Sequence, residues 1–175
     1  MLVLCVLGVV ACARGPTPQD RQRLEAEARD AAARLKGTLM KELSAALQQG
    51  GPLEALDVCA QRAQPLTAAS ATARTRVGRT SHRLRNPLNR APVWLQPTVD
   101  ALARGERVVS AMVDIGGGRF GYHEPLVTQP LCTTCHGSEL PDELGAAIAQ
   151  RYPDDAAVGF AAGDVRGLVW VELSP

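Results

Sequence analysis

The sequence predicts a mixed α/β (α+β) fold, in which long N-terminal helices precede an antiparallel sheet. Apolar residues recur at helical spacing over residues 20–49, and two strand-like runs further along meet at the Gly116–Gly118 turn. The 175 residues are enough for one domain behind an export segment. Only 3% of them are aromatic although 46% are hydrophobic, so Ala, Leu and Val must form most of the core.

The N-terminus has the features of an export signal. Residues 1–11 form an apolar run that is too short to span a bilayer as a helix. Val9-Val10-Ala11-Cys12 resembles the lipobox of bacterial lipoproteins, which makes Cys12 the lipidated residue. We therefore expect a lipoprotein signal peptide at residues 1–12, a tether at 13–19 and one domain at 20–175.

Two features of this signal leave alternatives open. No Lys or Arg precedes the apolar run, so a plain secretory signal cut near Ala13, or a start codon other than Met1, is also compatible with the sequence. Either signal exports the protein. We expect it on the periplasmic side of the cell envelope, lipid-anchored. The absence of Asp at position 13, a residue that retains lipoproteins at the inner membrane of Gram-negative bacteria, favours the outer membrane.

Two helices are expected to open the domain. The first covers Asp20–Gln49 and ends at Gly50-Gly51, since glycine commonly follows a helix C-terminus. The second begins at Pro52, which suits the first turn of a helix, and ends at Pro65. Cys59 lies beside the apolar stripe of this second helix, where it would ordinarily be a small buried residue. An odd cysteine in an exported protein is also a candidate for chemistry.

The segments that follow are less regular. Residues 67–76 are expected to be a helix end and a loop, and residues 79–89 an arginine-rich loop. Residues 91–102 have a helical pattern that Pro97 should break into two short pieces.

A strand pattern replaces the helical one after residue 106. Arg107–Ile115 and Arg119–Val127 should form a hairpin around the glycine turn. Pro125 within the second strand suggests a sheet edge or a bulge. A short helix at Leu144–Arg151 and a strand at Leu168–Leu173 complete the expected domain.

The segment Cys132-Thr133-Thr134-Cys135-His136 has the spacing for covalent attachment of a c-type haem. Two thiols one turn apart can add to the two vinyl groups of one porphyrin, and His136 then offers its imidazole as the proximal iron ligand. A redox disulfide is one alternative, but that motif normally opens a helix after a strand, whereas loop residues flank this one. A structural zinc site is another, but it needs a second closely spaced ligand pair, which the sequence lacks. Haem c, held through Cys132 and Cys135, is the expected cofactor.

The arginines after residue 78 have two possible roles. A cluster of arginines is usually a solvated surface. Guanidinium groups also pair well with carboxylates, so Arg79 or Arg85 is a candidate partner for a haem propionate.

Four segments of the chain occur in an order that is shared with a known family. They are Ala55–Cys59, Gly78–Asn89, Leu131–Gly137, and Tyr152–Ala156 running on to Gly163–Gly167. Together they resemble the Tll-like haem domain, a PAS-like, single-haem c-type family whose members occur alone or as extracytoplasmic sensor parts of signalling proteins. The resemblance implies a PAS-like antiparallel sheet with haem iron held by His136 on one side. In the family's characterised type the other ligand corresponds to Cys59.

The distal iron ligand has several candidates. The resemblance favours Cys59, and His123 is the alternative because it lies in a strand just upstream of the motif. His82 is more typical of a surface histidine, and Met112 of a strand core. A cysteine thiolate would stabilise ferric iron and give a low reduction potential, and a six-coordinate iron would have no free position for a substrate.

These features predict an exported mono-haem c-type protein that acts in electron transfer or redox sensing. A sensor of gas or another small ligand, in which the distal ligand is displaced, is the alternative. An enzyme is not expected, because no Ser/His/Asp or paired-carboxylate constellation stands out. The net charge of +1 and the lack of a basic stripe argue against nucleic-acid binding. The expected partners are an unidentified redox or signalling protein and, through the N-terminal lipid, a membrane; the sequence leaves the oligomeric state open.

Overall fold

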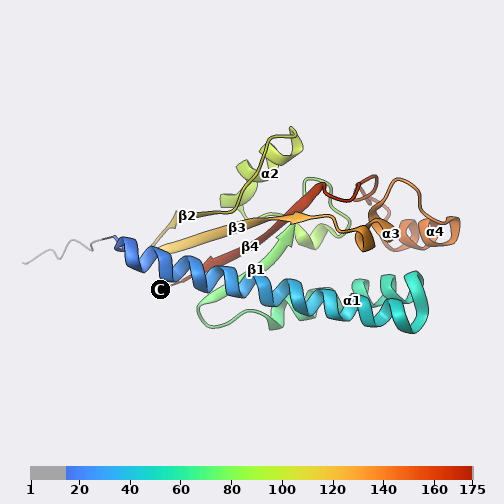
Figure 1. Cartoon of the computed structure of the whole chain (residues 1–175), viewed down its shortest axis with the longest axis horizontal. Helices are drawn as coiled ribbons and strands as arrows, with labels where there is room; N and C mark the ends of the chain where they lie inside the picture. Colours follow the sequence, from blue (N-terminus) through green and yellow to red (C-terminus); the bar gives the residue numbers. More distant parts are fainter. Residues whose placement is uncertain (1–14, 175) are drawn as a thin grey trace, which may run out of the picture.

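The structure is a computed structural model that describes residues 15–174. A long helical element comes first, and a four-stranded antiparallel sheet with short helices follows (Figure 1). The expected signal peptide, with Cys12, and residues 13 and 14 of the expected tether lie outside the described residues. Within the described range, no helix combines the length and the apolar character that a membrane crossing requires. The predicted α+β class is confirmed.

The first element, α1 (Pro18–Ala69), is a helical hairpin with a first arm before Gly51 and a second arm after it (Figure 1). Gly51 has a φ of 73° and a ψ of −161°, a backbone conformation that glycine adopts without the steric cost of a side chain. Arg62 of the second arm pairs with Glu42 of the first at 2.6 Å. The predicted break after Gly50 is confirmed. The second arm continues past its predicted end at Pro65 to Ala69.

The sheet has the strand order β1-β4-β3-β2, and every neighbouring pair is antiparallel. Its strands are β1 (Thr75–Thr80), β2 (Ala111–Gly116), β3 (Arg119–Val127) and β4 (Val165–Leu173). The prediction missed β1, because Thr-Arg-Val-Gly-Arg-Thr has a single apolar side chain and forms a strand only by pairing with β4. The predicted hairpin is confirmed, although β2 begins at Ala111 rather than Arg107.

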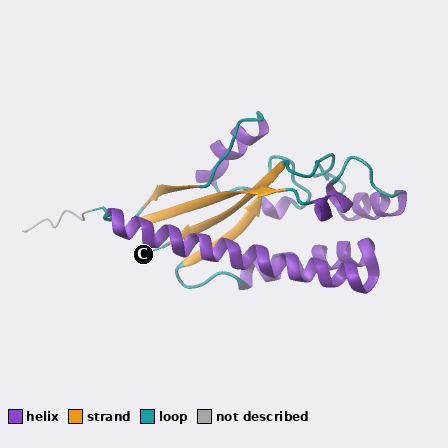
Figure 2. Cartoon of the chain, in the orientation of Figure 1, coloured by secondary structure: helices purple, strands orange, loops and turns teal. Residues whose placement is uncertain are grey.

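The remaining elements are short helices (Figure 2). They are α2 (Gln96–Ala103), α3 (Thr133–His136) and α4 (Asp142–Arg151), with 3₁₀ turns at Pro87–Asn89, Val93–Leu95 and Pro130–Cys132. Pro97 lies in the first turn of α2 and separates it from the 3₁₀ turn, as the sequence predicts.

The two faces of the sheet pack against different helices. The first arm of α1 covers one face through Ala28, Ala31, Ala32 and Leu35, which contact Val77, Phe120, Tyr122, Val169, Val171 and Leu173. The other face packs against α2 in a cluster of Leu95, Val99, Leu102 and Leu168 with Trp94 and Trp170. Successive residues of a strand therefore face different helices. Tyr122 lies on the α1 side, whereas His123 lies beside Trp94 on the α2 side.

Pro125 lies in the part of β3 that still pairs with β4 but no longer pairs with β2. The strand is central rather than at the edge, but its last pair with β2 is His123 with Ala111, so the missing N–H of Pro125 faces no partner on that side. The register with β4 also shifts between Leu126 and Val127, as in a bulge. The open end of β3 borders the candidate site described below.

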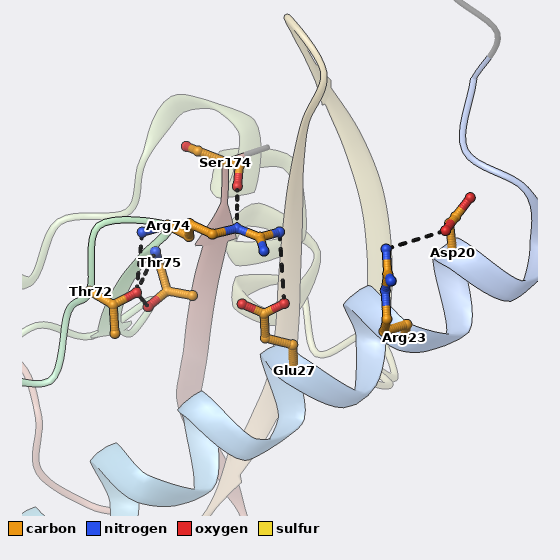
Figure 3. A network of polar contacts seen from close by, with 7 residues as sticks. All are labelled: Asp20, Arg23, Glu27, Thr72, Arg74, Thr75 and Ser174. Carbon is orange, nitrogen blue, oxygen red and sulfur yellow. Dashed lines mark hydrogen bonds and ion pairs between the residues drawn. The ribbon is translucent and has the colours of Figure 1, made fainter.

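A polar network fixes the opposite end of the sheet (Figure 3). Arg74, just before β1, donates from Nε to the Ser174 carbonyl at 3.3 Å and lies 3.9 Å from the Glu27 carboxylate on α1. The Thr72 and Thr75 hydroxyl groups bond to each other at 2.8 Å. This network ties the start of β1 to the end of β4 and to the first arm of α1.

We expect Gly78→Ala to destabilise the fold by about 1–3 kcal/mol, because the added methyl group would overlap the Trp170 indole on the α2 side of the sheet. Gly145→Ala is the matched control. A methyl group there meets nothing within 4 Å, and alanine in helix α4 should stabilise by up to about 1 kcal/mol. Urea unfolding followed by circular dichroism measures both, and equal midpoints for the two variants would contradict the packing argument.

Candidate functional site

The Cys-x-x-Cys-His segment folds into one compact turn. Pro130–Cys132 is a 3₁₀ turn that runs directly into α3 (Thr133–His136), which places the two thiols and the imidazole on consecutive turns. Cys132 is buried and Cys135 half-buried, and both are free thiols. Gly137 ends the helix with its amide bonded to the Thr133 carbonyl, and a side chain at that position would lie 2.6 Å from the same oxygen. The turn thus requires glycine directly after the histidine.

One nitrogen of the His136 ring is used by the protein. Nδ1 lies 2.7 Å from the Ala157 carbonyl oxygen, which can only accept, so Nδ1 carries the proton and Nε2 keeps its lone pair. Burial, together with the nearby Arg166 and Arg85 guanidinium groups, lowers the pKa of His136 to about 4. The ring is therefore neutral at pH 7, which is the form that binds a metal.

Arg85 binds two backbone carbonyl groups next to this histidine, that of the preceding residue Cys135 and that of Ala157, which also contacts the His136 ring. Its Nε donates to Asp155 at 3.1 Å, and Nη2 donates to the Cys135 carbonyl at 2.7 Å and to the Ala157 carbonyl at 3.3 Å. The side chains of Arg85 and Asp155 are only 13% and 8% exposed. Arg85, one of the two arginines predicted to bind a propionate, is thus engaged by a carboxylate of the protein itself.

A cavity of about 520 Å³ lies between the two arms of α1 and the open end of the sheet. Its walls are mostly apolar and include Leu35, Leu39, Leu43, Val58, Ala63, Leu66 and Val169. The same cavity is lined by Cys59, Arg79, Cys132 and Arg166. Two smaller cavities reach His136, and both share Cys59 and Arg166 with the large one. The structure therefore brings Cys59, Cys132 and His136 around connected space.

Two half-buried arginines, Arg79 and Arg166, give this cavity a positive character. The Nε atoms of Arg79 and Arg166 are inaccessible to solvent and have no hydrogen-bond partner among the described residues. Burial lowers the pKa of both arginines; the Cys59 thiol opposes the shift at Arg79, and the Cys132 thiol opposes it at Arg166. Burial likewise raises the pKa of Cys59, against the effect of Arg79, Arg85 and Arg166. An anion in the cavity would relieve the unfavourable burial of these charges.

The sequence analysis missed Arg166. It belongs to the Gly163–Gly167 segment that carries part of the family resemblance, and it opens a strand whose following residues are almost all apolar. A charged residue near the start of a mostly apolar strand was the feature of the sequence that could have identified Arg166 as a site residue. Its proximity to Cys59 could not be read from the sequence, since it depends on where β4 meets the second arm of α1.

Gly37 is an exposed residue at the rim of the large cavity. It lies in the middle of the first arm of α1 and lines the large cavity, where an added side chain would meet nothing within 4 Å. Glycine inside a helix costs about 1 kcal/mol relative to alanine. The mostly apolar cavity, the two free thiols, the neutral imidazole and the two arginines with buried, unpartnered Nε atoms are together a good fit to a haem.

The other ligand candidates lie elsewhere. The His123 ring is 6.5 Å from that of Trp94, on the face of the sheet away from Cys59, and His123 lines none of the three cavities described. The structure does not bring this alternative distal ligand to the site. Met112 packs into the core under α1, and His82 lies edge-on to Phe160 at 6.0 Å.

Comparisons with known proteins agree with this picture. A family model described as Tll0287-like matches residues 20–174. A solved structure, the crystal structure of the cyanobacterial heme-protein Tll0287, superposes with a TM-score of 0.59 and 20% sequence identity. The match covers 91% of this chain and 97% of that one. No curated protein sequence matches.

The lowered pKa of His136 predicts how the haem-free chain, prepared as Cys132→Ala/Cys135→Ala, responds to acid. Between pH 6.5 and about 4 the unfolded chain binds a proton at His136 and the folded chain does not. The free energy of unfolding therefore decreases as the pH is lowered through this window. The shift corresponds to about 3 kcal/mol. Urea unfolding at pH 7 and pH 4.5 measures the loss.

The same chain with His136→Gln serves as the comparison. Burial also lowers the pKa values of His82 and His123, so both chains keep a common acid sensitivity. Only the difference between them reports His136. We expect the His136→Gln chain to lose less stability on acidification, and identical losses would show that the histidine titrates normally.

Proposed function

The chain belongs to the Tll0287-like family, and on this premise we propose that it is a haem-binding protein that carries one c-type haem. Cys132 and Cys135 would hold the group through thioether bonds, and Nε2 of His136 would be the proximal iron ligand. The observation that carries this proposal is the convergence of both thiols, the imidazole and two arginines with buried, unpartnered Nε atoms on one set of connected cavities among the described residues.

Cys59 is the distal ligand in this proposal. It lines the same cavities as Cys132 and His136, and the second arm of α1 holds it there. Burial raises the pKa of Cys59, and the guanidinium groups of Arg79, Arg85 and Arg166 oppose that shift in favour of the thiolate. The thiolate is the form that binds iron.

Arg79 and Arg166 would hold the propionates. Both present a buried Nε without a partner among residues 15–174, and both line the large cavity. Guanidinium groups bind carboxylates through paired hydrogen bonds, and two propionates would balance the two buried positive charges. Arg85 is already paired with Asp155, which makes it the weaker candidate of the two arginines predicted from the sequence.

The bound haem would supply a one-electron ferric/ferrous couple. The protein's own residues would fix both axial ligands and exclude water through the apolar walls of the cavity, an arrangement suited to electron transfer or redox sensing rather than to catalysis. We propose that the protein is exported, anchored through a lipid on Cys12, and exchanges electrons with a redox or signalling protein outside the cytoplasm. The thiolate ligand would keep the reduction potential low.

A small-ligand sensor is the second candidate. Exposed residues of α1 and of the end of β3, among them Lys36, Met40, Val127 and Gln129, line the large cavity and give a small molecule a route to its interior. Burial raises the pKa of Cys59, which favours a neutral thiol that leaves iron readily. Displacement of this ligand would open a position for an external molecule.

The first test is to express the chain with the c-type maturation machinery and purify it. We expect a mass increase of one haem that denaturation does not remove, and a low-spin ferric electron paramagnetic resonance signal with thiolate character. Cys59→Ala should abolish the thiolate signal while the haem stays attached. A colourless product, or a Cys132–Cys135 disulfide in place of the haem, would refute the proposal.

Val58→Ala is the control for Cys59→Ala. It removes a neighbouring cavity-lining side chain from the same helix without touching the sulfur. The thiolate signal should survive in this variant. Survival of the signal in Cys59→Ala would instead exclude Cys59 as the ligand and leave the covalent attachment standing.

Carbon monoxide added to the reduced protein separates the two functional candidates. For electron transfer we expect the Soret band to stay unchanged, because Cys59 keeps its position on the iron. A prompt Soret shift at micromolar carbon monoxide would favour the sensor. Cys59→Ala, which has an open position in either case, shows the shift expected of a bound ligand.

A further inference from the structure

The carbonyl oxygen of Ala157 accepts hydrogen bonds from two side chains at once. His136 Nδ1 donates at 2.7 Å and Arg85 Nη2 at 3.3 Å. The same Arg85 nitrogen donates to the Cys135 carbonyl at 2.7 Å. One guanidinium group therefore contacts the backbone of a haem-binding cysteine and the carbonyl that orients the adjoining histidine.

Asp155 fixes both participants. One of its carboxylate oxygens accepts from Arg85 Nε at 3.1 Å, and the other accepts from the Ala157 amide at 2.9 Å. The carboxylate thus determines where the guanidinium group and the Ala157 peptide lie relative to each other. Both ionised side chains are almost fully buried, so their pairing is much stronger than that of a surface pair.

The backbone around this contact is also held on both sides. The Phe160 amide donates to the His136 carbonyl and the Gly159 amide to the Gly137 carbonyl, each at 2.9 Å. Arg83 lies over the Phe160 ring at 3.7 Å. The loop of residues 155–160 therefore has little freedom to adjust the distance between the Ala157 oxygen and His136.

We propose that Arg85 is a positioning residue for His136, which shares the Ala157 carbonyl with the imidazole and thereby raises the reduction potential of the haem iron. The inference rests on the proposed function. A carbonyl that already accepts from a cation is a weaker acceptor for Nδ1–H, so the imidazole has less imidazolate character and stabilises ferric iron less. Arg85 acts on the iron only through His136.

The test uses the haem-loaded protein with Arg85→Gln and Arg85→Lys. Gln removes the charge and the forked donor, whereas Lys keeps the charge but cannot reach Asp155 and both carbonyls together. We expect both variants to favour the ferric state by roughly tenfold, a fall of about 59 mV in a one-electron potential. A normal potential in Arg85→Lys with a fall in Arg85→Gln would show that charge alone acts, and would overturn the positioning role.

A second measurement begins with the parent protein and so does not depend on whether a variant folds. In the diamagnetic ferrous protein the His136 Nδ1 proton should exchange slowly with solvent and show a scalar coupling to the Ala157 carbonyl carbon across the hydrogen bond. Rapid exchange without this coupling would overturn the inference. In Arg85→Gln the proton should move downfield as its bond to Ala157 strengthens, and an unmoved resonance would overturn it equally.

These results are separable from the proposed function. Absence of covalent haem refutes both. Covalent haem with unchanged potentials and an unchanged Nδ1 resonance in both Arg85 variants refutes the inference alone. Arg104→Gln is the control for the loss of one positive charge, because Arg104 is an exposed cation that pairs with Glu106 and lines none of the three cavities. Its potential should stay close to that of the parent.

Discussion

Positive charge buried without a protein counter-ion is the constraint on which the site depends. Moving a guanidinium group out of water costs several kcal/mol unless an anion accompanies it. Arg85 meets this requirement through Asp155, but Arg79 and Arg166 face the large cavity with Nε atoms that no described residue satisfies. An anionic occupant of the cavity would satisfy both groups. This argument from charge is independent of the cysteine motif, and both are compatible with the haem of the proposed function.

The fold assembles the site from segments far apart in the chain. The turn at Gly51 returns the second arm of α1 to the sheet and brings Cys59 to the cavity. The ends of β1 and β4 supply Arg79 and Arg166, and the segment after β3 supplies the thiols and the histidine. The sheet also separates two environments, because Tyr122 and His123 are adjacent in sequence yet pack against different helices.

Local patterns in the sequence predicted the elements that local physics determines. The glycine break in α1, the hairpin around Gly116–Gly118 and the bounds of β3 follow from turn chemistry and periodicity. Strand β1 could not be predicted, because its polar sequence becomes a strand only beside β4. The family resemblance, and with it haem binding, was also readable from the sequence. The sequence did not show which arginine pairs with a carboxylate of the protein and which faces the cavity. Asp155 lies 70 residues from Arg85, and their pairing is visible only in the folded chain.

The first arm of α1 also sets a distance. From its N-cap at Thr17 to the cavity-lining residues Leu35 and Leu43, the helix rises roughly 30–40 Å at 1.5 Å per residue. If the chain is tethered to a membrane just before this helix, as proposed, the arm would act as a rigid spacer that can hold the proposed haem well clear of the lipid headgroups. A partner confined to the bilayer plane would then be out of reach, and any partner would have to project to the same height or diffuse freely.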